Sequence, residues 1–348
     1  MKNLCIFTLL LITFTSCEKA ILGEDEVNNP ENNFQIFWDD FDQHYGLFTA
    51  RGWDWDSIYQ VYQPQVTPLT TDDELWEVFR SMVDYLDDSH TFVYQPHVRF
   101  FSGNSSSDEQ VESEFSLEVL EENYLDNLQF WPNIPDERIY KFGQVRNKDI
   151  GYIYLNAVEF EDPAVIDEVL DQIGNHQAII LDLRNNHGGS DDSAAELAGR
   201  FADGEHFIYT VQEKNGPARD DFTAPREYFT QRKGRNFFDK PLILLTDRIT
   251  VSAAEILTSH LKAFELVTQI GDRTSGDFSD TGMRRFLPNG WQYQYSIMMF
   301  LQPDGSTLDG VGHLPNIQVR NSAMDIEAGN DLVMERALNF LFEEYGIE

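Results

Sequence analysis

Two stretches of the sequence, AIILDLR (178–184) and PLILLTD (241–247), are continuous apolar runs that end in polar residues. Such runs are typical of strands buried on both faces, as in a parallel sheet covered by helices. A helix-compatible stretch follows each run, beginning near Asp191 and near Ser252. The alternation predicts an α/β core, and functional groups are expected beyond the carboxyl ends of its strands.

The chain before these runs continues the same pattern. IGYIYL (150–155) predicts a strand, and the helix after it is expected to start at Asp162 and Pro163 and to end at Gly174. Residues 149–348 therefore form the expected catalytic α/β core.

The region before the core predicts helices. Apolar side chains at helical spacing form one stripe on residues 34–45, and these are Phe34, Phe37, Trp38, Phe41 and Tyr45. A second helix is expected over WDWDSIYQVY, and a third opens with the capping box formed by Thr71 and Glu74. Residues 34–100 are expected to form a small helical bundle, and 101–148 a linker or β segment.

The composition restricts the possible partners. The 348 residues include 60 acidic and 25 basic side chains, for a formal net charge of -35. A field of this sign repels phosphate backbones, so nucleic acid is not an expected partner. The sequence contains no HExxH motif and no GxGxxG loop, so neither a metal nor another cofactor is expected.

The N-terminal residues have the anatomy of an export signal. MKNLCIFTLLLITFTSC has a basic start, an apolar run and small residues before Cys17. TFTSC resembles a bacterial lipoprotein cleavage site, which implies that residues 1–16 are removed and that Cys17 is lipidated. A plain secretory signal is the alternative. Residues 17–33 are polar and acidic and suit a tether, so we expect an exported lipoprotein on the periplasmic or external face of the outer membrane, with the lipid as its membrane contact.

Ser252 is the candidate nucleophile. It follows a predicted buried strand through the turn DRITV and precedes the helical run AAEILTSHLKAF. A strand-to-helix turn exposes a hydroxyl and places the next N–H groups at a positive helix end. The same position also suits an ordinary N-cap serine, and local sequence alone leaves both interpretations open.

The segment DLRNNHGG provides a candidate oxyanion site. Paired glycines such as Gly188 and Gly189 allow a backbone N–H to point at a carbonyl oxygen. The alternative is a tight turn that only requires positive φ.

The pair DLRNNHGG and LLTDRITVSAAEI resembles the tricorn-core and C-terminal processing peptidase family, as do IGDRTSG and DGVGHLPNIQV further along. The resemblance implies a fold related to the ClpP and crotonase type and a serine peptidase that cleaves peptides or unfolded proteins. It assigns the oxyanion hole to the N–H groups of Gly188 and Ala253. Many relatives carry a PDZ module of about ninety residues between the helical bundle and the core, and the roughly sixty residues between His90 and Gly151 are too few for a complete one.

The family activates its serine in two ways. One branch uses a lysine after the glycine of the segment that here reads RTSGDFSD, where this chain has Asp277. The tricorn-like branch uses a Ser-His pair and an acid. LDDSHTFV (86–93) supplies Ser89 and His90, and Asp309 in TLDGVG stands at the place of the acid.

In this tetrad His90 would take the proton of Ser252, because a neutral imidazole suits that transfer at neutral pH. His187 and His313 are competing histidines within the glycine motifs, and Glu255 is interpreted as a structural carboxylate. A non-catalytic hydrophobic-ligand or peptide-binding protein on the same fold, and an esterase or amidase that uses the same serine, remain as alternatives. The sequence leaves the oligomeric state open.

Overall fold

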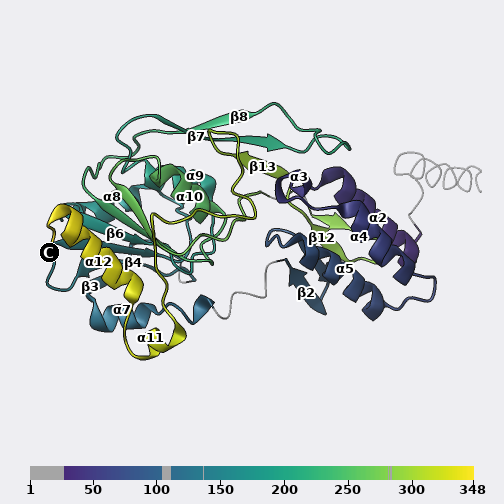
Figure 1. The fold of residues 1–348 in the computed structure, drawn as a ribbon, viewed down its shortest axis with the longest axis horizontal. Coiled ribbons are helices and arrows are strands. Elements are labelled where there is room, and N and C mark those ends of the chain that lie inside the picture. The colour runs from purple at the N-terminus through teal and green to yellow at the C-terminus, as the bar shows by residue number, and fades with distance from the viewer. Residues whose placement is uncertain (1–26, 104–110, 136, 281, 283) are drawn as a thin grey trace, which may run out of the picture.

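The computed structural model describes residues 27–103, 111–135, 137–280, 282 and 284–348, which form two lobes (Figure 1). The small lobe consists of residues 27–103 and 284–297, and the large lobe contains the remaining described residues. The predicted signal, Cys17 and most of the predicted tether lie outside the described residues. The helix α2 begins at Pro30, so the end of the predicted tether is helical.

The helices are α2 (Pro30–His44), α3 (Phe48–Arg51), α4 (Trp55–Tyr62), α5 (Asp72–Leu86), α7 (Leu117–Asn123), α8 (Ala164–Ile173), α9 (Asp191–Ala198), α10 (Ala253–Leu261), α11 (Ala323–Glu327) and α12 (Leu332–Tyr345), with a 3-10 turn η1 (Gln63–Gln65). The strands are β1 (Phe92–Gln95), β2 (Arg99–Ser102), β3 (Leu125–Phe130), β4 (Tyr140–Val145), β5 (Ile150–Leu155), β6 (Ala178–Asp182), β7 (His206–Glu213), β8 (Arg226–Thr230), β9 (Leu242–Thr246), β10 (Val267–Gly271), β11 (Arg285–Phe286), β12 (Gln292–Gln294), β13 (Met298–Leu301) and β14 (Ile317–Gln318).

A seven-stranded sheet in the order β14-β10-β9-β6-β5-β4-β3 forms the centre of the large lobe. Strands β5, β6, β9, β10 and β14 are parallel, whereas β4 and β3 add antiparallel to the edge. Every residue of β5, β6 and β9 is buried. The prediction of an α/β core with strands buried on both faces is therefore confirmed.

Both faces of this sheet are covered by helices. In β6, Ile179 and Leu181 pack in a cluster with α8, α9 and α10, and Ala178 and Ile180 pack in a second cluster with α7 and α12. Alternate residues of a strand point to opposite faces, so each strand contributes to both clusters. This arrangement explains why the strand sequences are apolar throughout.

The small lobe has a mainly aromatic core. Phe37 stacks on Phe79 with ring centroids 4.3 Å apart and lies 5.1 Å from the ring of Tyr293. The predicted capping box at the start of α5 is present, with Thr71 and Glu74 each bonding the other's backbone N–H. These contacts confirm the predicted helices of this lobe.

A segment from late in the sequence completes the small lobe. Strand β12 pairs with β1, and β11 pairs with β12, in a four-stranded antiparallel sheet of order β11-β12-β1-β2. Trp291, Tyr293 and Tyr295 enter the aromatic core with Phe37. The sequence predicted only helices for this lobe, because the periodicity of residues 34–100 does not reveal partners some two hundred residues away.

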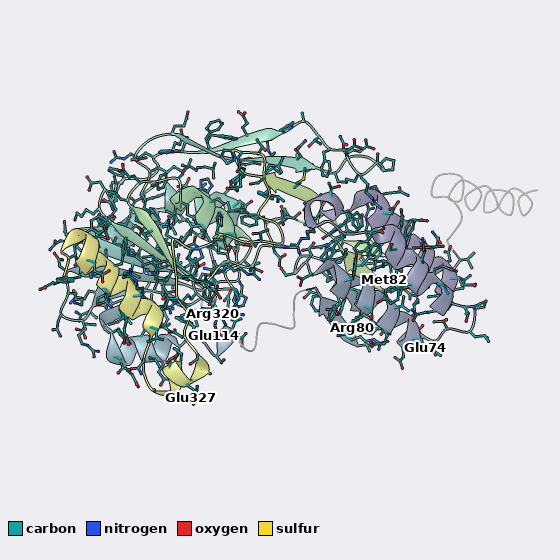
Figure 2. All side chains as sticks on the ribbon, in the orientation of Figure 1. Glu74, Arg80, Met82, Glu114, Arg320 and Glu327 are labelled. Atoms are coloured by element: carbon teal, nitrogen blue, oxygen red, sulfur yellow. The ribbon has the colours of Figure 1, made fainter. Side chains whose placement is uncertain are left out.

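Glu114 lies in the first described segment of the large lobe, 111–135. The Glu114 carboxylate pairs with Arg320 at 2.7 Å and with Arg248 at 3.0 Å. Figure 2 shows Glu114 and Arg320 next to each other where the chain reaches the large lobe. The segment predicted as a linker or β segment, 101–148, contains the end of β2 together with α7, β3 and β4, and the described part contains no PDZ module.

A three-stranded sheet, β13-β7-β8, reaches from the large lobe toward the small lobe (Figure 1). Arg219, between β7 and β8, donates to the carbonyl of Asp42 in α2 at 2.9 Å and stacks 4.3 Å from the ring of Phe48. The lobes therefore touch through side chains as well as through the chain itself.

We expect Phe37→Ala to lower the free energy of unfolding by about 3–5 kcal/mol, because the residue is fully buried and three rings would lose a partner. Phe342→Ala on the outer side of α12, 55% exposed, should change it by less than about 0.5 kcal/mol. Urea unfolding followed by fluorescence measures both. A small effect of Phe37→Ala would contradict the packing described for the small lobe.

Candidate active site

Ser252 lies in the turn between β9 and α10 with φ 59° and ψ −125°. A non-glycine residue in this region carries strain of about 1–3 kcal/mol and persists only where its surroundings enforce it. All residues of α10 are buried, so the start of this helix cannot shift to relieve the strain. A strained serine between a strand and a helix is typical of a nucleophile held at a sharp turn.

The backbone of Ser252 differs from that of the ordinary N-cap serines in the same chain. Ser116, Ser190 and Ser322 precede helices with φ of −147°, −112° and −103°, and each side chain accepts a hydrogen bond from its helix. An N-cap residue normally has this extended conformation. The positive φ of Ser252 thus favours the nucleophile interpretation over that of a simple cap.

The buried carboxylate of Asp247 shapes the turn before Ser252. It accepts the N–H of Asn185 at 2.9 Å and those of Ile249 and Thr250 at 3.0 Å. Burial raises the pKa of this carboxyl to about 6, against the lowering effect of its hydrogen bonds and of Arg184. Asp247 thereby ties the loop after β6 to the loop after β9.

The glycine turn after β6 lies directly against Ser252. A Cβ atom on Gly188, where φ is 83°, would lie 2.7 Å from the Cβ of Ser252. The Gly188 N–H donates to Asn186 Oδ1 at 2.9 Å, and the Gly188 carbonyl accepts the N–H of Val158 at 2.7 Å. The Gly188 N–H, which was predicted to donate to the oxyanion, is thus hydrogen-bonded within its own loop.

Two other N–H groups lie at this turn. The peptide after Gly188 is trans, so the Gly189 N–H points opposite to the Gly188 carbonyl and away from Val158. Ala253 is the first residue of α10, where a helix provides no intrahelical acceptor for the N–H. The Ala253 N–H directly follows Ser252, and Gly189 directly follows the glycine that packs against Ser252.

Glu255, one turn into α10, bonds both loops of the site. Oε2 accepts the N–H of Ser252 at 3.2 Å and that of Asp277 at 2.9 Å. Oε1 accepts the hydroxyl of Thr274 at 2.6 Å and the N–H of Gly276 at 2.8 Å. Burial raises the pKa of Glu255 to about 8, opposed by these donors. A carboxylate enclosed in this way has a structural function.

Ser89 and His90 lie in the loop between α5 and β1. The Ser89 N–H donates to Asp277 Oδ2 at 3.3 Å, and the His90 N–H donates to Asp88 Oδ1 at 3.0 Å. Asp88 is fully buried, and its Oδ1 lies 3.9 Å from Nδ1 of His90. The hydroxyl of Tyr45 donates to Asp88 at 3.1 Å. Asp88 therefore holds the backbone of His90, and its carboxylate lies near the ring without a hydrogen bond to Nδ1.

Asp277 and Asp309 are both buried beside Arg51. Asp277 forms an ion pair with this guanidinium, whereas Asp309 Oδ1 lies 3.8 Å from it and accepts the N–H of Phe278 at 3.1 Å. Burial would raise the pKa of Asp277, but Arg51 and the nearby His90 outweigh it, so this pKa is lowered. Burial raises the pKa of Asp309 to about 7, although Arg51 lowers it.

A continuous series of contacts connects the predicted residues. Ser252 shares an oxygen of Glu255 with the backbone of Asp277, and Asp277 bonds the backbone of Ser89 next to His90. Among the described contacts, Asp309 reaches this series through Arg51 rather than through Ser89. The carboxylate that contacts Ser89 is therefore that of Asp277.

The competing histidines differ from His90 in their surroundings. His313 is buried, its Nε2 lies 2.9 Å from the hydroxyl of Ser259, and burial lowers its pKa to about 3. His187 is exposed on the glycine turn. By contrast, His90 interacts electrostatically with Asp191 at the start of α9, where desolvation and neighbouring carboxylates raise the pKa of Asp191 to about 6.

Sequence reasoning missed Arg51, Asp88 and the contact role of Asp277. Asp88 stands directly before the Ser-His pair, a position from which it could have been suspected. Arg51 has no comparable signal, since a single arginine in a helical region normally indicates a surface charge. The described residues contain no group of three side chains that could hold a metal ion. They also contain no helix long and apolar enough to cross a membrane.

An α/β core with a strained serine at a strand-to-helix turn, packed against a glycine turn, defines the class of serine hydrolases. Residues 149–319 match the family described as Peptidase family S41, and residues 27–84 match the Tricorn protease C1 domain. The first match covers most of the large lobe together with the small-lobe segment 284–297, and the second lies in the small lobe. The chain belongs to peptidase family S41, which includes the tricorn-like and C-terminal processing peptidases.

Individual relatives agree with this. A probable CtpA-like serine protease of Staphylococcus epidermidis is 30% identical over 141 residues, 40% of this chain and 27% of that protein. The carboxyl-terminal-processing protease of Picosynechococcus sp. is 26% identical over 212 residues, 60% of this chain and 49% of that protein. The chain thus spans about a quarter to a half of the length of these relatives.

A solved structure of a candidate peptidase from Parabacteroides merdae is similar over nearly the whole chain. It has a TM-score of 0.79 and 25% identity, covering 90% of this chain and 97% of that one. The crystal structure of the tricorn protease, at 17% identity and a TM-score of 0.51, shares the fold. The predicted family is confirmed.

We expect Ser252→Gly to unfold with a free energy about 1 kcal/mol higher than Ser252→Ala, because glycine relieves the strain that alanine keeps. At Ser81, inside α5, the order should reverse by about 1 kcal/mol, since glycine is unfavourable within a helix. Denaturant titration of the four variants gives both differences. Equal stability of the two Ser252 variants would show that the turn is not strained.

Proposed function

We propose that this chain is a serine peptidase that hydrolyses peptide bonds, with Ser252 as nucleophile and His90 as general base. The observation that carries the proposal is the backbone of Ser252, held at φ 59° against Gly188 at the start of a buried helix. Such a conformation has a cost, and ordinary capping does not require it.

The proposed reaction uses Ser252 and His90. His90 accepts the proton of the hydroxyl while Oγ bonds to the carbonyl carbon of the scissile peptide, and the carbonyl oxygen becomes an oxyanion. We propose that the N–H groups of Ala253 and Gly189 stabilise this charge, because the Gly188 N–H predicted as a donor would first have to leave Asn186. His90 then gives its proton to the leaving amine, and water repeats the sequence on the acyl-enzyme.

We assign the acid of the site to Asp277. Its carboxylate accepts the Ser89 N–H and lies within electrostatic range of His90, so it stabilises the imidazolium that forms during proton transfer. Asp88, 3.9 Å from the ring, adds to this stabilisation. Asp309 keeps its predicted place near the site with a supporting role through Arg51.

The substrates we propose are peptides or unfolded proteins. Two curated relatives are described as a serine protease and a carboxyl-terminal-processing protease, and this chain covers only part of each. Cleavage near the carboxyl end of a substrate is therefore part of the proposal.

The proposed location is the outer membrane of a bacterium, on its periplasmic or external face, with Cys17 as the lipid anchor. The support is the sequence around Cys17, which combines an apolar run, small residues and a polar acidic stretch.

We expect Ser252→Ala to reduce cleavage of an unfolded polypeptide to background, and His90→Ala to reduce kcat by about 10²–10⁴-fold, the usual contribution of a general base. Ser306→Ala, in an exposed turn, serves as the control and should keep full activity. A fluorophosphonate probe should label wild type and Ser306→Ala but not Ser252→Ala. Undiminished cleavage by Ser252→Ala would refute the assignment.

We expect Cys17→Ser, expressed in a bacterium that processes lipoproteins, to lose incorporation of labelled palmitate and to move from the membrane fraction to the soluble fraction, since the thiol is the site of lipid attachment. Cys5→Ser, within the predicted signal, is the matched control and should stay labelled. Labelling that persists in Cys17→Ser would contradict the proposed anchor.

A further inference from the structure

Arg51, the last residue of α3, is an unusually buried cation. Its side chain is only 3% exposed. A buried guanidinium is costly unless its donors are paired with acceptors or charges. The contacts of its two terminal nitrogens therefore indicate what Arg51 does.

The guanidinium of Arg51 joins the two loops that carry the site. Nη1 donates to the carbonyl of Asp87, at the beginning of the loop with Ser89. Nη2 donates to the carbonyl of Gly276 at 3.0 Å and to the carboxylate of Asp277. One side chain of the small lobe thus bonds both its own loop and the loop of the large lobe opposite it.

Several buried groups surround this cation. The carboxylates of Asp88, Asp277 and Asp309 are 0%, 1% and 2% exposed, and the hydroxyl of Tyr45 is also buried. Each of these four groups raises the pKa of Arg51 above its ordinary value, although burial lowers it. Arg51 in turn favours the ionised form of Asp277, which burial alone would disfavour.

We propose that Arg51 is a positioning residue for catalysis, which holds the Asp277 carboxylate as an anion against the Ser89 N–H and so fixes the loop that presents His90. Arg51 touches no reacting atom and acts through Asp277. The planar fork of arginine suits this function, because it can bond a carbonyl and a carboxylate at the same time. The inference rests on the proposed function of Ser252 and His90.

A purely structural role for Arg51 makes a different prediction. Arg219 provides the comparison, because it also joins the lobes, through Asp42 and Phe48, but is not part of the site. If Arg51 only connects the lobes, its loss should affect stability as the loss of Arg219 does. If it positions Asp277, its loss should also change the pH dependence of the reaction.

The experiment measures kcat, KM and kcat/KM on an unfolded polypeptide between about pH 3 and 9 for wild type, Arg51→Met, Arg51→Lys and Arg219→Met. In Arg51→Met we expect kcat to fall roughly 100-fold, as for a misplaced catalytic group. Asp277 loses the charge that favours ionisation, so its pKa rises and the acidic limb of kcat/KM should move up by at least about one pH unit.

The two other variants make the result specific. Arg51→Lys keeps the positive charge but not the fork, so its acidic limb should stay near that of wild type while kcat falls. Arg219→Met should keep both kcat and the wild-type limb. If Arg51→Met does not fold, the test rests on Arg51→Lys. A wild-type kcat in Arg51→Lys would then overturn the proposal.

Two further results would separate the positioning role from the proposed peptidase function. An Arg51→Met enzyme with the same pH profile as Arg219→Met would overturn the positioning role while leaving the peptidase intact. A wild type without Ser252-dependent cleavage would overturn the proposed function and this inference with it.

Discussion

The buried carboxylate of Glu255 accepts hydrogen bonds from the two loops that meet at the candidate nucleophile. Its oxygens bond the N–H groups of Ser252, Gly276 and Asp277 and the hydroxyl of Thr274. A buried donor without an acceptor costs about 1–3 kcal/mol, so a structure that satisfies all four is strongly favoured over one that relaxes the turn. The strain in Ser252 is offset by these bonds, and the loop of Asp277 is fixed by the same oxygens.

This arrangement depends in turn on the sheet. Strands β6, β9 and β10 are parallel neighbours, so their carboxyl ends bring the glycine turn, Ser252 and the loop of Asp277 to one edge. Helix α10 is buried on all sides and cannot rotate to carry Ser252 away. The backbone of the site is thus set by the large lobe, whereas the small lobe contributes the Ser-His pair.

The parts that could be predicted from the sequence are those with a local cause. Strands buried on both faces require continuous apolar runs, and the capping box at Thr71 requires only neighbouring residues, so both were predicted. The pairing of β12 with β1 could not be, because it joins segments far apart in the chain. The bond between Gly188 and Asn186 was missed because a short amide side chain often bonds a backbone group two residues away, and spacing does not reveal when it does.

The choice between two candidate acids also could not be made from the sequence. Asp277 and Asp309 both stand in glycine-containing loops, and motif position favoured Asp309. The two carboxylates differ in which one accepts the backbone N–H of Ser89, and this depends on the position of the small lobe relative to the large lobe.

Buried charged side chains fix the position of the small lobe on the large lobe. Three carboxylates and one guanidinium meet at their junction, and ions removed from water are tolerated only at matched positions. A small displacement of the lobes would break the ion pair between Arg51 and Asp277 while both groups stay buried, which costs more than breaking an exposed ion pair. The same buried charges therefore contribute to the chemistry of the site and restrict the position of the small lobe. The Ser-His pair can reach Ser252 only when the small lobe occupies that position.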